Sequence, residues 1–234
     1  MIWKSLGAAV TVASLAVSMV RAGEPAVLKW SNLVDEAAQQ FEDPYRDLAL
    51  AELSDLVSIV RLQDRLEAGD LDKQARPRVE ARIAQKRGAL EAAGIDIEWL
   101  LEQRWVVAER RERAAMAANP DLDGQVVQIG GYLIPAPPSE DGQETAYLVP
   151  ERGMCSHTPP PPPNQLLRLI VDEEPQTSWL YAATVVRGTL RMKETRRDMI
   201  VVDGLVPMRS SWTLETEALE FVGRLRAPGA ATTK

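Results

Sequence analysis

The chain has one cysteine and one histidine, and they lie two positions apart as Cys155 and His157. In an extended chain, residues two apart point to the same side, so both side chains could face one ion. Thiolate and imidazole groups are good ligands for zinc and copper. A closed zinc site needs four ligands, and Glu151 is a further candidate by sequence, whereas two ligands could hold Cu(I) at low coordination. The pattern predicts a zinc or copper site at Cys155 and His157.

Two other interpretations of this pair remain open. A thiol–imidazole catalytic pair needs a third group that orients the ring, and no such group or oxyanion donor is identifiable in the sequence. A reactive free thiol is also a liability outside the cytosol, so we do not expect an enzyme. Alternatively, Cys155 packs as a small apolar residue in the core. The incomplete ligand set favours this packing over metal ligation.

A run of five prolines follows the pair and has its own physical consequences. Prolines favour the polyproline II conformation, so the run spans roughly 15 Å and has no backbone donors for a sheet. It could be an exposed rod that docks on an aromatic groove of a partner. It could equally be a strut that holds the Cys155 loop in place, which the shortness of the run favours. The predicted docking or strut residues are Pro159, Pro160, Pro161, Pro162, Pro163, Asn164 and Gln165.

The N-terminus has the features of a secretory signal peptide. Lys4 precedes an uncharged, mostly apolar stretch from Leu6 to Val20, and Ala22 suits the position before a cleavage site. A stretch of about 15 residues is short for a transmembrane helix of roughly 20, although an uncleaved anchor is the alternative. We therefore predict a signal peptide over residues 1–22 and a periplasmic location. In that oxidising compartment a lone thiol must be buried, bound to metal or paired with another molecule.

The charge of the mature chain narrows the choice of partners. Without Lys4 and Arg21 the chain has 25 basic and 34 acidic residues, which gives a formal charge of -9. This charge argues against nucleic acid and anionic membrane surfaces as partners.

Residues 23–119 have a helical pattern. Asp43-Pro44 resembles a helix start, and Leu53, Leu56, Val57 and Val60 lie on one helical face that ends at Gly69-Asp70. A second helix is expected from about residue 76 to 93, and a third after Asp96. The charged run at 109–113 in the third helix is expected to be a solvated face.

Residues 120–225 have a β pattern. The expected strands are 126–134 with a bulge or bend at Gly130-Gly131, then 145–149, 166–171, 183–192, and a fifth within 199–206 or 210–214. The fold class predicted is therefore α+β, with an N-terminal helical segment followed by a small five-stranded, OB-like β-barrel domain. Residues 226–234 are expected to be a disordered tail.

Three segments resemble the uncharacterised bacterial family DUF3299. They are Gly131-Tyr132-Leu133-Ile134-Pro135, Tyr147-Leu148-Val149-Pro150, and the loop from Gly153 to Gln165, which fits G-x-C-x-H-x-PPPPPNQ. The resemblance implies an exported protein, and some members are encoded beside ABC transporter subunits and proteins linked to metal supply. The resemblance therefore implies that the chain is an exported accessory or binding protein that is linked to a metal and works with an ABC-type transporter or another exported protein. The alternative is a scaffolding module whose proline loop docks a partner without metal or catalysis.

Overall fold

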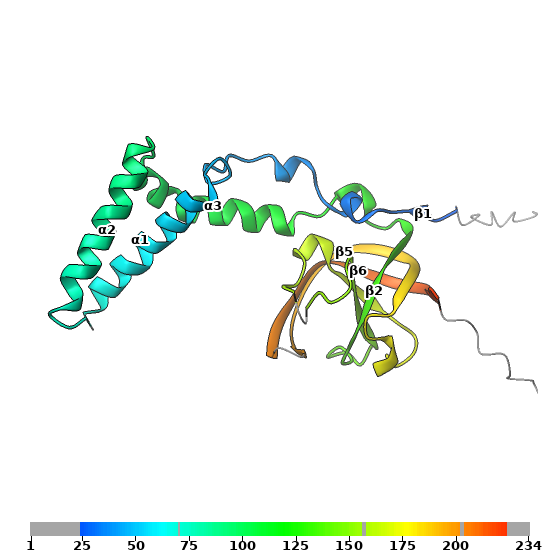
Figure 1. Cartoon of the computed structure of the whole chain (residues 1–234). Coiled ribbons are helices and arrows are strands. Elements are labelled where there is room, and N and C mark those ends of the chain that lie inside the picture. Colours follow the sequence, from blue (N-terminus) through cyan, green and yellow to red (C-terminus); the bar gives the residue numbers. More distant parts are fainter. Residues whose placement is uncertain (1–23, 70, 156–157, 202–203, 224–234) are drawn as a thin grey trace, which may run out of the picture.

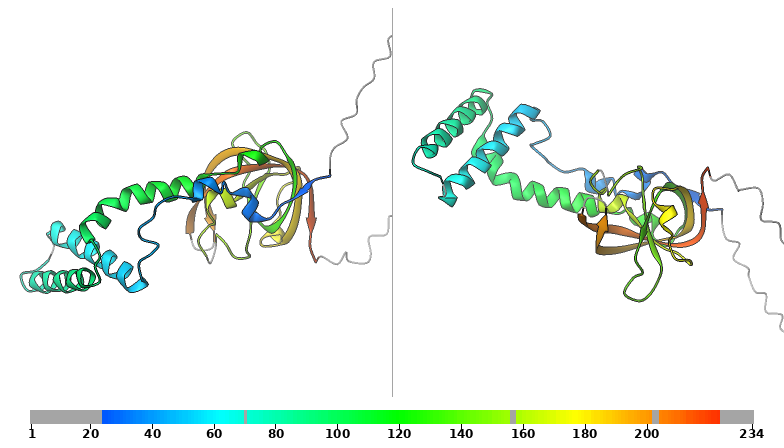
Figure 2. Two further views of the ribbon diagram at one scale, coloured as in Figure 1. Left: turned by 90° about the horizontal axis from the view of Figure 1, so that it is seen from above. Right: turned by 60° about the horizontal axis from the view of Figure 1, so that its bottom comes forward.

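A computed structural model describes residues 24–69, 71–155, 158–201 and 204–223. Within these ranges the chain forms three α-helices and a six-stranded mixed sheet, so the predicted α+β class is confirmed (Figure 1). The predicted signal peptide and C-terminal tail lie outside the described residues. The helices form an arm that extends away from the sheet, as the additional views show (Figure 2).

The arm contains α1 (Leu50–Ala68), α2 (Ala75–Ala92) and α3 (Ile97–Met116). Gly69 ends α1 with a φ of 78°, and the Asp96 carboxylate caps α3 by accepting from the Trp99 N–H at 3.0 Å. The predicted start of the first helix at Asp43 is wrong. The first helix begins at Leu50, where the Glu52 carboxylate accepts from the backbone N–H of residue 49 at 2.7 Å.

The sheet contains β1 (Ala26–Val27), β2 (Val126–Ala136), β3 (Thr145–Val149), β4 (Leu167–Ile170), β5 (Ala183–Val201) and β6 (Gly204–Phe221). The strand order is β1-β2-β3-β4-β6-β5, and β2 also pairs with β5, so five strands pair in a ring to which β1 is added. The pairings β1–β2 and β4–β6 are parallel. Both expected positions of the fifth strand are part of one long hairpin, because 199–201 ends β5 and 210–214 lies within β6.

Strand β2 runs through Gly130-Gly131 in unbroken register with β5, so the expected bulge is absent there, and the strand changes partners at Tyr132. Residues before Tyr132 pair with β5 and residues after it pair with β3. A Cβ atom on Gly131 would lie 2.7 Å from the Val149 carbonyl oxygen and 2.9 Å from the Trp30 ring. Only glycine lets the strand and the Trp30 indole approach so closely.

Residues before the arm pack on the sheet, which the sequence analysis did not predict. Strand β1 pairs with β2, and Leu33 is buried in the sheet core with the fully buried Trp212 of β6. The Trp212 indole N–H donates to the Leu33 carbonyl oxygen at 3.3 Å. From β1 onward the described chain therefore lies on the sheet, leaves it to form the arm, and returns through α3.

The C-terminal end of α3 connects the arm to the sheet. The Ser211 hydroxyl of β6 donates to the Met116 carbonyl oxygen at 2.7 Å, and Arg209 of β6 forms an ion pair with Glu112 of α3 at 2.5 Å. The charged run at 109–113 is therefore not only a solvated face. Arg111 binds the buried Asp43 carboxylate with two hydrogen bonds of 2.8 and 2.9 Å.

Candidate functional site

The predicted loop leaves β3 and folds back on itself at Cys155. The backbone of Cys155 has a positive φ of 68°, and its N–H donates to the Thr158 carbonyl oxygen at 3.0 Å. The Tyr181 hydroxyl donates to the Met154 carbonyl oxygen at 3.1 Å and fixes the entry to the loop. The cysteine is therefore held in a tight, hydrogen-bonded turn.

The surroundings of Cys155 are apolar. Its side chain is buried, and it belongs to a core cluster with Ile134, Ala136, Tyr147, Val149, Leu166, Met199 and Met208, against which Met154 and Tyr132 also pack. Burial raises the pKa of the Cys155 thiol to about 11. At neutral pH the thiol is protonated, which disfavours both a nucleophile and a ready zinc ligand.

The predicted partner His157 lies outside the described residues, so the pairing of Cys155 with His157 stays a prediction. Among the residues that the structure describes, no group of three or more His, Cys, Asp or Glu side chains could hold a metal ion. The nearby Glu151 is exposed.

The proline run leads to a buried asparagine that contacts α3. Pro161 is buried whereas Pro159 and Pro162 are exposed, and Pro163 begins the short turn η4 (Pro163–Gln165). The Asn164 side-chain N–H groups donate to the carbonyl oxygens of Ala114 and Ala117, both at 2.9 Å. These contacts tie the end of the loop to the end of α3, and the strut interpretation of the proline run stays a prediction.

A second feature is a cleft of about 450 Å³ on the sheet, which we call the basic cleft. It lies where β3, β4 and β5 meet the loop between β2 and β3, and it is lined by Ser139, Glu140, Asp141, Tyr147, Arg168, Lys193, Thr195, Arg196 and Arg197. Four of these side chains are cationic and two are carboxylates. The cleft is thus basic although the whole chain has a formal charge of -7.

The cations of the basic cleft differ in their contacts. Arg197 donates to the carbonyl oxygens of Pro137 and Pro138 at 2.9 and 2.7 Å, which fixes one wall of the cleft. Arg168, Lys193 and Arg196 form no ion pair with any residue in the described ranges. These three cations are therefore available to an anionic ligand.

Two uncharged groups complete the cleft. The Thr195 hydroxyl oxygen is buried and has no hydrogen-bond partner within the part of the chain that the structure describes. Burial raises the pKa of the Tyr147 phenol, which forms part of the floor. On the rim, the Ser139 hydroxyl bonds to Asp141 and, together with nearby Arg168, lowers the pKa of that carboxyl. A ligand with acceptor oxygens would neutralise the cations.

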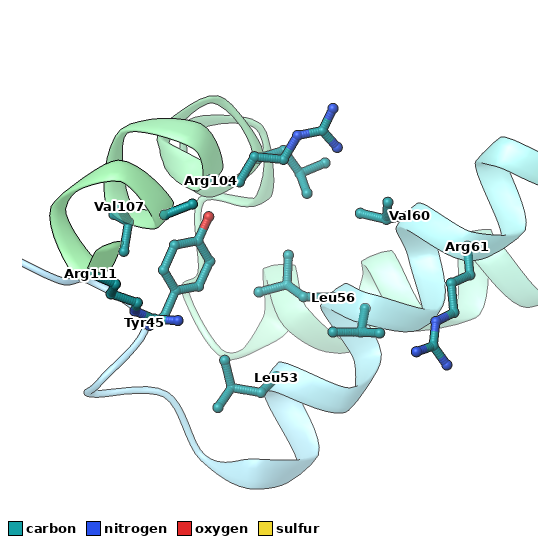
Figure 3. Close-up of a pocket in the computed structure, with 11 residues that line it drawn as sticks. Tyr45, Leu53, Leu56, Val60, Arg61, Arg104, Val107 and Arg111 are labelled. Atoms are coloured by element: carbon teal, nitrogen blue, oxygen red, sulfur yellow. The ribbon is translucent and has the colours of Figure 1, made fainter. Parts of the chain in front are cut away.

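A third feature is an open, largely apolar groove of about 450 Å³ in the arm, which we call the arm groove (Figure 3). It runs between α1 and α3 beside Tyr45, whose hydroxyl donates to the Leu100 carbonyl oxygen. The lining residues are Tyr45, Leu53, Leu56, Val57, Val60, Arg61, Leu101, Arg104, Val107, Ala108 and Arg111. The predicted apolar face of the first helix is confirmed, but no other described segment covers it completely.

Sequence reasoning missed both the basic cleft and the arm groove as sites. The whole chain is acidic, but the five-residue stretch 193–197 contains three cations, Lys193, Arg196 and Arg197. Charge patterning would therefore have singled out this stretch. No local pattern joins them to Arg168, which is brought alongside by strand pairing. The arm groove could have been suspected from Arg61, which flanks the apolar face of α1.

The fold and these features define an α+β protein with a basic cleft on the sheet and an apolar groove in the arm. The family model described as "Protein of unknown function (DUF3299)" matches residues 30–220, and the chain belongs to this family. The resemblance inferred from the sequence motifs is thereby confirmed.

One solved structure that matches is a DUF3299 family protein from Pseudomonas aeruginosa PAO1. It is 21% identical, the match covers 85% of this chain and 97% of that chain, and the TM-score is 0.43. No curated protein matches the chain. Among the described residues, no helix is long and apolar enough to span a membrane.

Proposed function

We propose that the chain is an exported, periplasmic accessory protein that acts by binding, and that it holds an anionic ligand in the basic cleft. The observation that carries the proposal is the group of three cations, Arg168, Lys193 and Arg196, without an ion-pair partner in the described residues. Like charges gathered in one cleft repel one another, and a bound anion removes that repulsion. Arginine guanidinium groups also match the geometry of carboxylate and phosphate oxygens.

The position of the cleft supports this proposal. The ring of pairings β2-β3-β4-β6-β5-β2 supports an OB-like barrel, the finer architecture that we propose for this sheet. Barrels of this type bind ligands on the face of their second and third strands and on the adjoining loops. Here the second and third strands of the ring are β3 and β4, which carry Tyr147 and Arg168.

Export and a transporter partner remain part of the proposal. They rest on the predicted signal peptide over residues 1–22 and on the resemblance of the loop to DUF3299. An ABC-type transporter subunit or another exported protein is the partner we expect. The scaffolding alternative stays open, because Pro159 and Pro162 are exposed although Pro161 and Asn164 are buried.

A binding measurement on the chain from residue 23 to 234 tests the cleft. Tripolyphosphate is a suitable probe, titrated by calorimetry at low and high salt. We expect saturable binding that Arg168→Gln/Arg196→Gln weakens at least about thirtyfold, since each lost charge-assisted hydrogen bond is worth roughly 1 kcal/mol or more.

The matched control is Arg78→Gln/Arg82→Gln on α2, which changes the net charge equally but lies outside the cleft. It should leave the affinity unchanged at high salt. Equal loss in both double variants, or no saturable binding by the unsubstituted chain, would refute an anion site in the cleft.

Metal handling is a second candidate function, and the sulfur atoms around Cys155 favour copper over zinc. Met154, Met199 and Met208 pack in the same cluster as Cys155. Thiol and thioether groups are soft ligands that select Cu(I). The test is to incubate the mature chain and Cys155→Ser with Cu(I) or Zn²⁺ and to measure bound metal. No stoichiometric metal in the unsubstituted chain would exclude this function, whereas equal binding by Cys155→Ser would place the metal elsewhere.

A further inference from the structure

The arm is a three-helix unit with one uncovered side. The three helices share a buried core that includes Leu56 and Ile59 of α1, Ile83 and Leu90 of α2, and Leu100 of α3. Beside this core, Val57 is 47% exposed and lines the arm groove between α1 and α3. Figure 3 shows the Leu53 and Leu56 side chains facing Tyr45 across this groove. A fourth helix laid along the groove would complete a four-helix packing.

The charges at the groove have one sign. Its lining residues include Arg61 from α1 and Arg104 and Arg111 from α3, and no carboxylate. Arg111 is already bound to Asp43, but Arg61 and Arg104 form no ion pair in the described part of the chain. Arg104 instead lies over the ring of Trp105, 5.1 Å from its centroid, and Trp105 is 71% exposed. Arginine at the edge of an apolar groove is typical of binding hot spots.

We propose that the arm groove binds an amphipathic helix of a partner protein, with an apolar face toward Leu53 and Val57 and carboxylates toward Arg61 and Arg104. The two cations come from opposite walls, so acidic residues on both flanks of one bound helix would meet them. Helices in such grooves insert apolar side chains at positions i, i+3 or i+4, and i+7. The bound helix is expected to be acidic because the lining residues include Arg61 and Arg104 and no carboxylate that could neutralise them. This inference does not depend on the basic cleft, which lies on the sheet.

Synthetic helices test the proposal directly. One 18-residue peptide carries leucine at i, i+3, i+4 and i+7 with glutamate on both flanks, and a second peptide has lysine in place of every glutamate. Fluorescence anisotropy with the mature chain should show binding of the glutamate peptide at least about tenfold tighter than the lysine peptide, because the flanking charges then attract rather than repel.

Charge reversal of the protein gives the decisive comparison. Arg61→Glu/Arg104→Glu should reverse the preference and bind the lysine peptide more tightly, while the matched control Arg78→Glu/Arg82→Glu on α2 should keep the original order. The reversed preference is a gain of binding, so misfolding cannot produce it. Circular dichroism confirms that each variant retains its helices.

Other occupants of the groove would overturn the proposal. The proposal fails if palmitate binds stoichiometrically and displaces the glutamate peptide, because the groove would then be a lipid site. It also fails if the chain alone sediments as a dimer that Val57→Asp dissociates, because the occupant would then be a second copy. Equal affinity for both peptides would exclude a role for Arg61 and Arg104.

Discussion

Substitution of Asn164 tests whether the proline loop acts as a strut. Its two hydrogen bonds to α3 would be lost in Asn164→Ala, at about 1 kcal/mol each. The two carbonyls would not be orphaned, because Ala114 also accepts from the Gln39 side chain at 2.9 Å and Ala117 from the Asp35 N–H at 3.2 Å. The void left by a residue that is 3% exposed adds about 1 kcal/mol. We expect the free energy of unfolding to fall by about 3 kcal/mol.

A second variant at this position separates hydrogen bonding from packing. Asn164→Asp keeps the size but places a carboxylate against two carbonyl oxygens, so at pH 7 it should destabilise more than Asn164→Ala. Burial and the carbonyls raise the folded-state pKa of the new carboxyl above its unfolded value, so the stability deficit is largest at high pH. The deficit should shrink as the pH falls through the folded-state pKa toward about 4, the unfolded value, because the protonated carboxyl can again donate.

Urea unfolding followed by circular dichroism between pH 4 and 8 measures both effects. Gln165→Ala is the matched control, since the structure shows no hydrogen bond from the Gln165 side chain to a described residue; it should cost less than about 1 kcal/mol. A loss below about 1 kcal/mol in Asn164→Ala, or identical pH profiles of Asn164→Ala and Asn164→Asp, would refute the strut.

Three further predictions follow from single contacts. Asp43→Asn should cost about 1–2 kcal/mol at pH 7, since the ion pair with Arg111 lowers the pKa of Asp43 below 3.8. The difference in unfolding free energy between Asp43→Asn and the unsubstituted chain should disappear as the pH falls through that lowered pKa, which urea titrations measure. A difference that stays constant with pH would contradict this prediction. Gly131→Ala should destabilise by about 2–3 kcal/mol in thermal unfolding because a Cβ there overlaps the β3 backbone. The control Gly88→Ala on α2 has open space and should stabilise by up to about 1 kcal/mol; equal effects would refute the overlap. Cys155 should react with iodoacetamide at pH 8 at least about a hundredfold more slowly in the native chain than in urea, because its pKa is about 11 rather than 9.0. Mass spectrometry measures the rates, and rapid native alkylation would show that the thiol is accessible.

Local patterns in the sequence predicted several elements well. The strand over 145–149 has the expected bounds, the end of α1 is at Gly69, and Asp96 caps α3. These features depend on residues close in sequence: a glycine with positive φ, a side chain that caps the next turn, or an unbroken run of apolar residues. The family was also evident from the loop motif.

Elements whose formation depends on distant partners were predicted poorly. Asp43-Pro44 has the local features of a helix start, but the Asp43 carboxylate binds Arg111, which is 68 residues away. The two residues of β1 form a strand because β2 lies beside them. The second half of β5 is likewise a strand because β6 returns along it.

The amino-acid sequence was sufficient to predict the α+β class and the family, and it contains a Cys155 loop followed by a proline run. Only the tertiary structure showed what surrounds these features. It surrounds Cys155 with apolar side chains, which raises the pKa of the thiol. It also brings Arg168 of β4 beside Lys193 and Arg196 of β5, and leaves Val57 uncovered between two helices. Burial and charge clustering depend on which segments lie side by side after folding, and no local pattern in the sequence contains that information.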